Sequence, residues 1–487
     1  MNQRDLAIKK ILSLLWLWLT LFLQIQSLNG FQRLFYWHAD PPTRSTRTRC
    51  RSSVPSISIN NNIKPEHYVV HTGRSADMIK RSPALSGITL CNGWSPSATD
   101  AFRRAVQACV TKNPILSGHV YEKHKRELWI QTGTFSPESH EYCKLLQPPS
   151  ITDPSLSSMA KDDNDSQILN ELMTRYLDLF DSSELTSEQI NKRLPLFAAS
   201  LMVQDDVALF SMKLSHAVGD GVTFFEILKQ VSLLMSNDGH DSPTIPCIEW
   251  NHPLKPTHEF YPPNFSDCDI EISYGTPFLL GCVKNVVTQY GRRKPSVFLI
   301  DKNKISTLKR KLREDARGNN DSTTAPVSSN DVITSGLCQA NVGADLFVFT
   351  ENVRALVDDI PRNAGGNFFW EIPVRREVCV QPERLRGFIQ AQQQQHQHMD
   401  DKQSQQLPWR PFLCGTVARV TSLASITESI VYKDVKTICT LPAVSFMKDI
   451  PLDVAVIFRY NKAYWGVLHN SFAFDTTNTT LQDAIVY

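Results

Sequence analysis

Apolar positions recur along the chain at two spacings, one typical of helices and one typical of strands. Helical spacing predicts a helix that has Ser97 or Thr99 as its N-cap and ends at Pro114. Alternation over residues 115–121 then predicts a strand, which forms a hairpin with residues 128–131. These elements indicate a domain of mixed α/β structure.

The most regular pattern lies in the middle of the chain. Two runs, 196–203 and 207–214, flank an Asp-Asp turn and predict an antiparallel hairpin. Apolar positions in residues 222–235 recur at helical spacing, so a helix follows the second strand. Two glycines between strand and helix permit a sharp turn. A strand, a tight turn and a helix in this order can present one side chain from the turn, that of His216.

Length predicts two halves, because 487 residues exceed what one ordinary core accommodates. The N-terminal half, 63–290, opens with a strand from His67 to His71. The C-terminal half, 291–487, opens with a strand over residues 296–300 and a basic helix over residues 305–313. The charges of this helix are typical of a solvated helix face.

Two polar segments interrupt these halves. Residues 150–167 are rich in acidic and small polar residues and predict a surface loop or disordered insert, closed by a helix over 168–180. Residues 390–406 are rich in glutamine and have no apolar face, which predicts a disordered surface insert. His396 and His398 lie there, and no metal site is expected from them.

Charge and cysteine content exclude several classes of function. The formal net charge is +2, and the body of the chain has no long basic stretch interleaved with aromatic residues, so nucleic acid is not expected as a partner. The 11 cysteines are scattered without a Cys-x-x-Cys pair. We therefore expect reduced, mostly buried thiols rather than a zinc ribbon or a redox site.

The N-terminal segment has the composition of a targeting sequence. Basic residues precede the apolar run 11–23, which is shorter than the about 20 residues of a membrane span and suits a signal-peptide core. Residues 31–62 then contain five arginines and one acidic residue, Asp40. This order resembles the two-part plastid presequence of algae with secondary plastids. Secretion, the endoplasmic reticulum and a signal anchor are the alternatives, and in each case residues 1–62 are expected to lie outside the fold.

A histidine, a carboxylate and a glycine share the central turn. Residues 214–221 read Leu-Ser-His-Ala-Val-Gly-Asp-Gly, so His216 precedes Asp220 and Gly221 at fixed spacing. A lone histidine is most often a hydrogen-bonded core residue, and an aspartate before glycine commonly caps a turn. The fixed spacing of the three residues, on a turn between a strand and a helix, favours a catalytic role instead. We predict that His216 is a general base, because neutral imidazole has an ordinary pKa near 6.5.

At this motif the chain resembles the coenzyme A-dependent acyltransferase superfamily, whose hallmark is His-x-x-x-Asp, often followed by glycine. The superfamily includes chloramphenicol acetyltransferase, BAHD and alcohol acyltransferases, wax ester synthases and nonribosomal peptide condensation domains. The resemblance extends over residues 64–487. Four further segments resemble the family in the correct order: 101–120, 327–340, 352–368 and 453–475.

Two departures narrow the branch of the family. The Asp-Phe-Gly-Trp-Gly signature of plant BAHD enzymes does not occur in the sequence. Ser215 stands where condensation domains and wax ester synthases usually carry a second histidine, and no carrier or adenylation segment accompanies the domain. A free-standing acyltransferase is therefore expected rather than a module of an assembly line.

The resemblance implies a fold and a set of roles. The fold would be α/β, with two chloramphenicol acetyltransferase-like domains, each a mixed, mostly antiparallel sheet with helices, and an active-site channel between them. Asp220 would pair with Arg354 in the matching strand, and Gly221 would let the backbone approach closely. Candidates for contacts to the oxyanion or substrate are Ser328, Ser329 and Asn367, for which a cap or loop role is the alternative.

The expected function is transfer of an acyl group from a thioester, acyl-CoA, to a hydroxyl acceptor in preference to an amine. The protein would bind small molecules and no resident cofactor or metal, and it would act as a monomer, with peripheral membrane contact left open. Two alternatives differ in class. One is a non-catalytic binding protein with the same fold, and the other is a condensation-type enzyme that uses carrier-bound acyl groups.

Overall fold

The computed structural model describes residues 67–72, 84–123, 127–136, 141–147, 186–237, 247–250, 295–318, 326–354, 360–397, 416–427, 435–442, 453–470 and 479–486, with isolated positions between them. The chain divides into Met1–Asn62 and Ile63–Tyr487. The first unit, which is the predicted presequence, lies outside the described residues, as do almost all of the predicted insert 150–167 and the helix predicted over 168–180.

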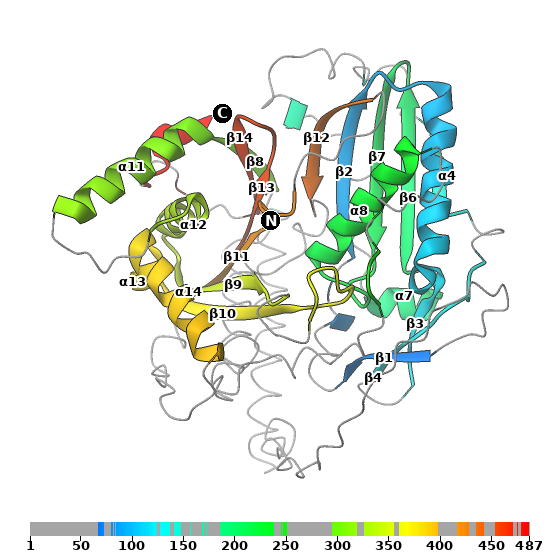
Figure 1. The fold of residues 1–487 in the computed structure, drawn as a ribbon, viewed down its shortest axis with the longest axis horizontal. Helices are drawn as coiled ribbons and strands as arrows, with labels where there is room; N and C mark the ends of the chain where they lie inside the picture. The colour runs from blue at the N-terminus through cyan, green and yellow to red at the C-terminus, as the bar shows by residue number, and fades with distance from the viewer. Residues whose placement is uncertain are drawn as a thin grey trace, which may run out of the picture. The chain divides into compact units, whose positions relative to one another are not determined.

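A five-stranded sheet carries the central motif (Figure 1). All neighbouring pairs are antiparallel except β5 and β6. Its strands in spatial order are β12 (Lys436–Pro442), β2 (Leu85–Asn92), β7 (Val207–Leu214), β6 (Phe197–Gln204) and β5 (Cys143–Leu146). The predicted hairpin around the Asp-Asp turn is thus confirmed, with β6 and β7 as its strands.

Two helices cover one face of this sheet. They are α4 (Pro96–Lys112) and α8 (Gly221–Ser236), and they pack against each other. Phe102 of α4, Phe210 of β7 and Phe225 of α8 belong to their common apolar core. Burial of such aromatic side chains contributes roughly 1.5–3 kcal/mol each, which anchors the start of α8 beneath the turn that follows β7.

A seven-stranded sheet forms the second layer of structure. It is antiparallel except where β11 pairs with β9 and β13, which run parallel to it. In spatial order its strands are β10 (Phe369–Arg375), β9 (Ala344–Asn352), β11 (Thr416–Ser422), β13 (Asp453–Arg459), β14 (Tyr464–His469), β8 (Ser296–Asp301) and β15 (Ile485–Val486). The expected α/β class with two mixed, mostly antiparallel sheets is confirmed.

The two sheets share an apolar core. Leu209 of β7 and Leu90 of β2 lie in the same buried cluster as Val348 of β9 and Val456 of β13. The division of the sequence at residue 290 is not kept by the sheets, because β12 comes from the C-terminal half and pairs with β2 of the N-terminal half. The two halves are therefore joined by backbone hydrogen bonds as well as by side-chain packing.

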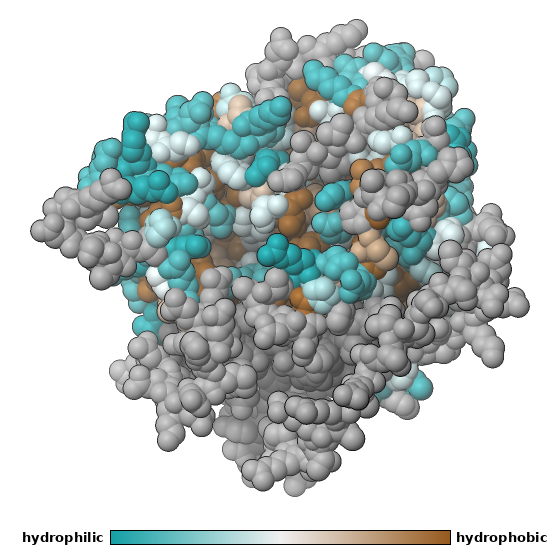
Figure 2. Space-filling model, in the orientation of Figure 1, coloured by the Kyte–Doolittle hydropathy of each residue, from teal (hydrophilic) through white to brown (hydrophobic). Residues whose placement is uncertain are grey.

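Four helices accompany the seven-stranded sheet. They are α11 (Lys302–Gly318), α12 (Ser329–Ala340), α13 (Arg376–Cys379) and α14 (Pro382–Gln397). On α11, Ile305 is buried, whereas the basic residues Lys304, Arg310 and Lys311 are exposed. Hydrophilic residues accordingly cover this helix in the space-filling view (Figure 2). The basic helix predicted over residues 305–313 thus lies within α11, with its charges facing solvent.

A small sheet and short helices complete the described part. The strand order is β1-β4-β3, so β3 and β4 form the predicted hairpin. The elements are β1 (His67–Thr72), β3 (His119–Glu122), β4 (Glu127–Gln131), α7 (Thr186–Lys192) and the 3-10 helices η1 (Pro114–Ser117) and η8 (Gln482–Ala484). Among the residues that the structure describes, no helix is long and apolar enough to cross a membrane.

Three local expectations were wrong. The N-cap of α4 is Ser95 rather than Ser97 or Thr99, because Pro96 occupies the first helical turn, where its missing N–H costs nothing. Residues 115–117 are helical, so the strand begins only at His119. Residues 390–397 of the predicted disordered insert continue α14, which the good helix propensity of glutamine favours. Residues 398–406 lie outside the described residues.

Candidate active site

His216 lies on the turn that joins β7 to α8. The Ser215 N–H donates at 2.8 Å to the carbonyl of Leu196, the residue directly before β6, and the Val218 N–H donates to the Ser215 carbonyl at 3.0 Å. The hydroxyl of Ser215 is buried and donates to Oε1 of Gln189 in α7 at 2.5 Å. The residue before the histidine is therefore fixed through both its backbone and its side chain.

Asp220 ends this turn and begins α8. Its Oδ1 accepts the Thr223 N–H at 3.0 Å, which makes Asp220 the N-cap of the helix, and it also accepts the Thr223 hydroxyl at 3.2 Å. Its Oδ2 accepts the Phe368 N–H at 2.9 Å. A capping role satisfies a backbone donor that the helix itself leaves unpaired. The alternative interpretation of Asp220 as a turn cap is thus part of its role.

The guanidinium of Arg354 meets the same carboxylate with two nitrogens. Nη1 donates to Oδ2 of Asp220 at 2.8 Å and Nη2 donates to Oδ1 at 3.0 Å. The two side chains are only 1% and 7% exposed. Parallel hydrogen bonds of this kind suit the planar fork of arginine and are stronger than neutral ones. Asp220 and Arg354 are therefore brought together as the resemblance implies.

The remaining donors of Arg354 are also satisfied. Nε donates to the carbonyl of Ala364 at 2.8 Å, and Nη2 also donates to the carbonyl of Gly366 at 2.8 Å and to the hydroxyl of Thr223 at 2.9 Å. Arg354 was expected within a strand, but it comes two residues after the end of β9. Because the chain leaves the sheet there, the guanidinium can reach the 364–366 backbone and α8 at once.

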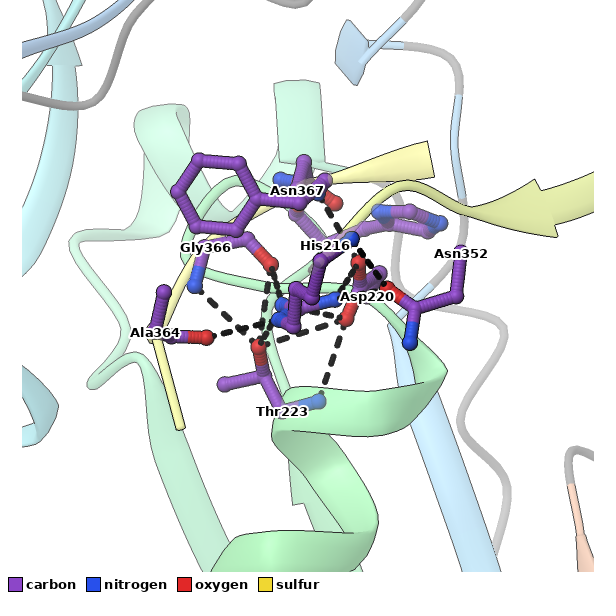
Figure 3. A network of polar contacts seen from close by, with 9 residues as sticks. His216, Asp220, Thr223, Asn352, Ala364, Gly366 and Asn367 are labelled. Carbon is purple, nitrogen blue, oxygen red and sulfur yellow. Dashed lines mark hydrogen bonds and ion pairs between the residues drawn. The ribbon is translucent and has the colours of Figure 1, made fainter. Parts of the chain in front are cut away.

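A loop between β9 and β10 closes the network from the other side. Gly366 has φ of 149°, a conformation that residues with a Cβ rarely adopt. Its N–H donates to the Thr223 hydroxyl at 3.1 Å, and its carbonyl accepts from the Asp220 N–H at 3.2 Å. The next residue, Asn367, donates from Nδ2 to the backbone carbonyl of His216 at 2.8 Å (Figure 3).

Burial and neighbours move the pKa of Asp220 in opposite directions. Burial alone would raise the pKa of this carboxyl group. The positive charge and hydrogen bonds of Arg354, with the N–H groups of Thr223 and Phe368, outweigh burial and lower its pKa below the ordinary 3.8. Asp220 is therefore ionised at neutral pH, and among the described residues none of its hydrogen bonds goes to the His216 ring.

For the imidazole of His216, burial outweighs the effect of the neighbouring groups on the pKa. Burial lowers its pKa below the ordinary 6.5, while its own backbone carbonyl, the Asp220 carboxylate and Asn367 oppose that shift only in part. Its Nδ1 is buried and has no hydrogen-bond partner on another described residue. The ring of Phe369 lies edge-on to it, with 6.2 Å between ring centroids. A neutral imidazole at physiological pH can accept a proton, as a general base must.

Of the other predicted site residues, Gly221 lies in the network element α8, whereas Ser328 and Ser329 lie at the start of α12. Gly221 is the first residue of α8, and a Cβ built there would lie 3.0 Å from Cδ2 of Leu423, so the close approach is to a side chain. Ser328 is the N-cap of α12 in a capping box with Asp331, and Ser329 accepts from Nζ of Lys309 at 3.3 Å. These bonds tie both serines to α11 and α12 rather than to the network around Asp220.

Sequence reasoning missed three contributors to the site. Thr223, one turn into α8, bonds to Asp220, Arg354 and Gly366, and its spacing of three from an N-cap aspartate was the available signal. Gln189 supports Ser215 from a helix that no motif marked. The positive charge of Arg419 in β11 lowers the pKa of His216, and only the three-dimensional fold brings this strand near the turn.

Among the described residues, no three side chains of the His, Cys, Asp or Glu type gather as a metal site would require. No protein-family model and no curated protein sequence matches the chain.

Solved structures do match. TRI101 of F. graminearum complexed with coenzyme A and deoxynivalenol is 12% identical, with a TM-score of 0.55 over 83% of this chain and 94% of that one. TRI101 of F. sporotrichioides complexed with coenzyme A and T-2 is 11% identical, with a TM-score of 0.52 over the same shares. Vinorine synthase is 13% identical, with a TM-score of 0.53 over 88% of this chain and 96% of that one. At these identities the likeness establishes the fold alone, which the chain shares with TRI101 and vinorine synthase.

Proposed function

We propose that the protein transfers an acyl group from acyl-CoA to a hydroxyl group of a small-molecule acceptor, with His216 as general base. The observation that carries the proposal is the geometry of the turn. A neutral imidazole lies between a strand and a helix, and the Asp220–Arg354 ion pair anchors the end of its turn. The same fold in TRI101 is complexed with coenzyme A, which supports a coenzyme A thioester as the donor.

The proposed reaction needs one base and no covalent intermediate with the protein. His216 takes the hydroxyl proton as the acceptor oxygen attacks the thioester carbonyl, which forms a C–O bond. The tetrahedral intermediate then breaks its C–S bond, and the imidazolium returns the proton to the departing thiolate. Products are the ester and free coenzyme A. The preference for a hydroxyl follows from chemistry, because a deprotonated amine attacks without a base whereas a hydroxyl must lose its proton during attack.

The roles of the two ionisable groups in the turn differ. Nδ1 of His216 is buried, so we assign the proton of the neutral ring to Nδ1 and the role of base to Nε2. The Asp220 carboxylate is fully engaged by Arg354, Thr223 and Phe368, so we assign it to holding the turn. The proton therefore moves between the acceptor, Nε2 and the thiolate.

A condensation-type enzyme is less well supported. The position of a second histidine is occupied by Ser215, whose hydroxyl is buried and donates to Gln189. We propose that the protein acts as a monomer. We also propose, from residues 1–62 alone, that the protein is delivered to a plastid. A fluorescent protein fused after residue 62 would locate to the plastid, and retention in the endoplasmic reticulum would refute this address.

The proposed function is tested with the full chain, a panel of acyl-CoAs of increasing length and mixtures of hydroxyl and amine acceptors. Free thiol would report turnover, and mass spectrometry would identify the acylated product. We expect thiol release coupled to ester formation by the wild type and not by His216→Ala. His119→Ala is the matched control, because it also removes a largely buried imidazole, in β3, and should retain activity. Coenzyme A binding without turnover would instead support the non-catalytic binding protein.

A further inference from the structure

Asn367 is held on both sides by the buried ion-pair network. The residue before it, Gly366, is bonded through its N–H to Thr223 and through its carbonyl to Arg354. The residue after it, Phe368, donates its N–H to Asp220, and its carbonyl accepts the Val353 N–H at 3.0 Å. Its backbone position is therefore set by four contacts, and the side chain is left to act on something else.

That side chain acts on the histidine. Nδ2 of Asn367 donates to the backbone carbonyl of His216 at 2.8 Å, and Asn367 itself is only 5% exposed. The hydrogen bond links a loop of the C-terminal half to a turn of the N-terminal half, 151 positions away. Because the bond fixes the peptide group of His216 within the turn, it restrains the position from which the imidazole extends.

The charges around His216 come from three elements. Asp220 begins α8, Arg354 follows β9 and neutralises Asp220, and Arg419 lies in β11. Asp220 and Asn367 favour the protonated ring, and Arg419 disfavours it. Phe369, directly after the loop, contacts the ring through its edge. Asn367 is thus the uncharged polar side chain through which the loop influences both the orientation and the protonation of the base.

We propose that Asn367 is a positioning residue that holds the carbonyl of His216 and thereby keeps Nδ1 of the ring protonated and Nε2 directed at the acceptor. This inference rests on the proposed function and adds a residue whose role there would otherwise be a substrate contact. It requires no direct contact between Asn367 and the substrate.

Two substitutions of Asn367 are expected to shift the pKa of His216 in opposite directions. Asn367→Ala removes a group that favours the imidazolium, so the pKa of His216 falls and the acidic limb of kcat/KM moves to lower pH. Asn367→Asp adds a negative charge, so the pKa rises and the limb moves to higher pH. Both variants lose the amide donor, and kcat should fall by about fivefold to tenfold in each while KM changes little, since one neutral hydrogen bond is lost.

The loop supplies a matched control. Nδ2 of Asn363 donates to the Cys247 carbonyl at 2.9 Å and to Oε1 of Glu249 at 3.1 Å, on the exposed side of the loop and away from His216. Asn363→Ala should therefore leave the pH limb and kcat unchanged. Thermal unfolding of each variant shows whether the fold is retained.

The decisive readout is the pKa of His216 in the full chain without substrate, from NMR titration of the histidine ring signals, with the His216 signal assigned from its absence in His216→Gln. We expect a lower pKa in Asn367→Ala, a higher one in Asn367→Asp and no change in Asn363→Ala. Equal pKa values in the wild type and both Asn367 variants would overturn the positioning role, even if activity falls. Shifted pKa values in a protein that transfers no acyl group would instead refute the proposed function and keep the positioning role.

Discussion

Asp220 and Arg354 form a buried, two-fold hydrogen-bonded ion pair, although 134 positions separate them in the sequence. The carboxylate begins the helix after the His216 turn, and the guanidinium comes from the end of β9 in the other half. The pair therefore links the two halves directly beside the proposed base. Its contribution to the site is mechanical, because the polar atoms of both partners bond to each other, to Thr223 and to backbone groups of the loop 364–368.

Removal of one partner should unfold the protein more easily. Arg354→Met leaves the Asp220 carboxylate buried without its cation, and such losses cost about 3–5 kcal/mol. Urea unfolding of the full chain measures the change. Lys192→Met is the control, since Lys192 and Glu188 form an exposed pair on α7. Such exposed pairs contribute about 0–1 kcal/mol. A similar, small effect for both variants would contradict the structural role of the buried pair.

The Asp220–Arg354 pair should make the free energy of unfolding depend on pH in the acidic range. The pKa of Asp220 in the folded protein lies below the ordinary 3.8, so the folded state binds its proton later than the unfolded state as pH falls. Its stabilisation is therefore complete above about pH 4 and is lost as pH falls through the folded pKa. The difference in unfolding free energy between the wild type and Asp220→Asn should be constant from neutral pH to about pH 5 and should shrink below the ordinary pKa. A difference that grows on acidification would be incompatible with this account.

Gly366 should not tolerate a side chain. Its φ of 149° strains any residue with a Cβ, and the loop around it carries Asn367 and the acceptors of Arg354. We expect Gly366→Ala to lower stability by about 1–3 kcal/mol and to reduce kcat as well. Gly387→Ala is the matched change, because Gly387 lies in α14, where an added Cβ would meet no described atom within 4 Å, and it should stabilise by about 0.5–1 kcal/mol. Differential scanning calorimetry shows whether each substitution lowers or raises the stability.

The pH profile should report the burial of His216. Because burial lowers its pKa, the base stays neutral and active below its ordinary value of 6.5, and kcat/KM should fall only at lower pH. Arg419→Gln removes a positive charge that disfavours the imidazolium, so the limb should move to higher pH. Arg310→Gln, on the exposed face of α11, should leave the limb in place. Initial rates across the acidic and neutral range decide, and an unmoved limb in Arg419→Gln would exclude this charge from the site.

The periodicity of apolar residues predicted the strand and helix around His216. It could not predict which distant strands pair with each other. The change from alternation to helical spacing placed His216 at the end of β7 and before α8, because both periods are visible in the sequence. The pairing of β12 with β2 could not be predicted, since nothing in residues 436–442 identifies a partner so distant in the chain. The partner of Asp220 came from the family resemblance.

Candidate residues outside the turn have contacts within the protein, and their contact with the oxyanion or substrate stays a prediction. Ser328 stands before Ser-Asn-Asp, a pattern that fits a helix cap as readily as a ligand, and the structure has the cap. Asn367 was predicted as a contact to the oxyanion or substrate, and the structure brings it to the carbonyl of His216. Gln189 and Arg419 act through contacts between elements, and such contacts leave no periodic signal in the sequence.

The rate of ester formation by His216→Ala decides whether His216 is the proton acceptor in acyl transfer. With a donor and acceptor pair that the wild type turns over, we predict a fall in kcat of at least about 10²-fold to 10⁴-fold, with an unchanged unfolding midpoint and unchanged binding of coenzyme A. A variant that forms the ester at the wild-type rate would contradict the account.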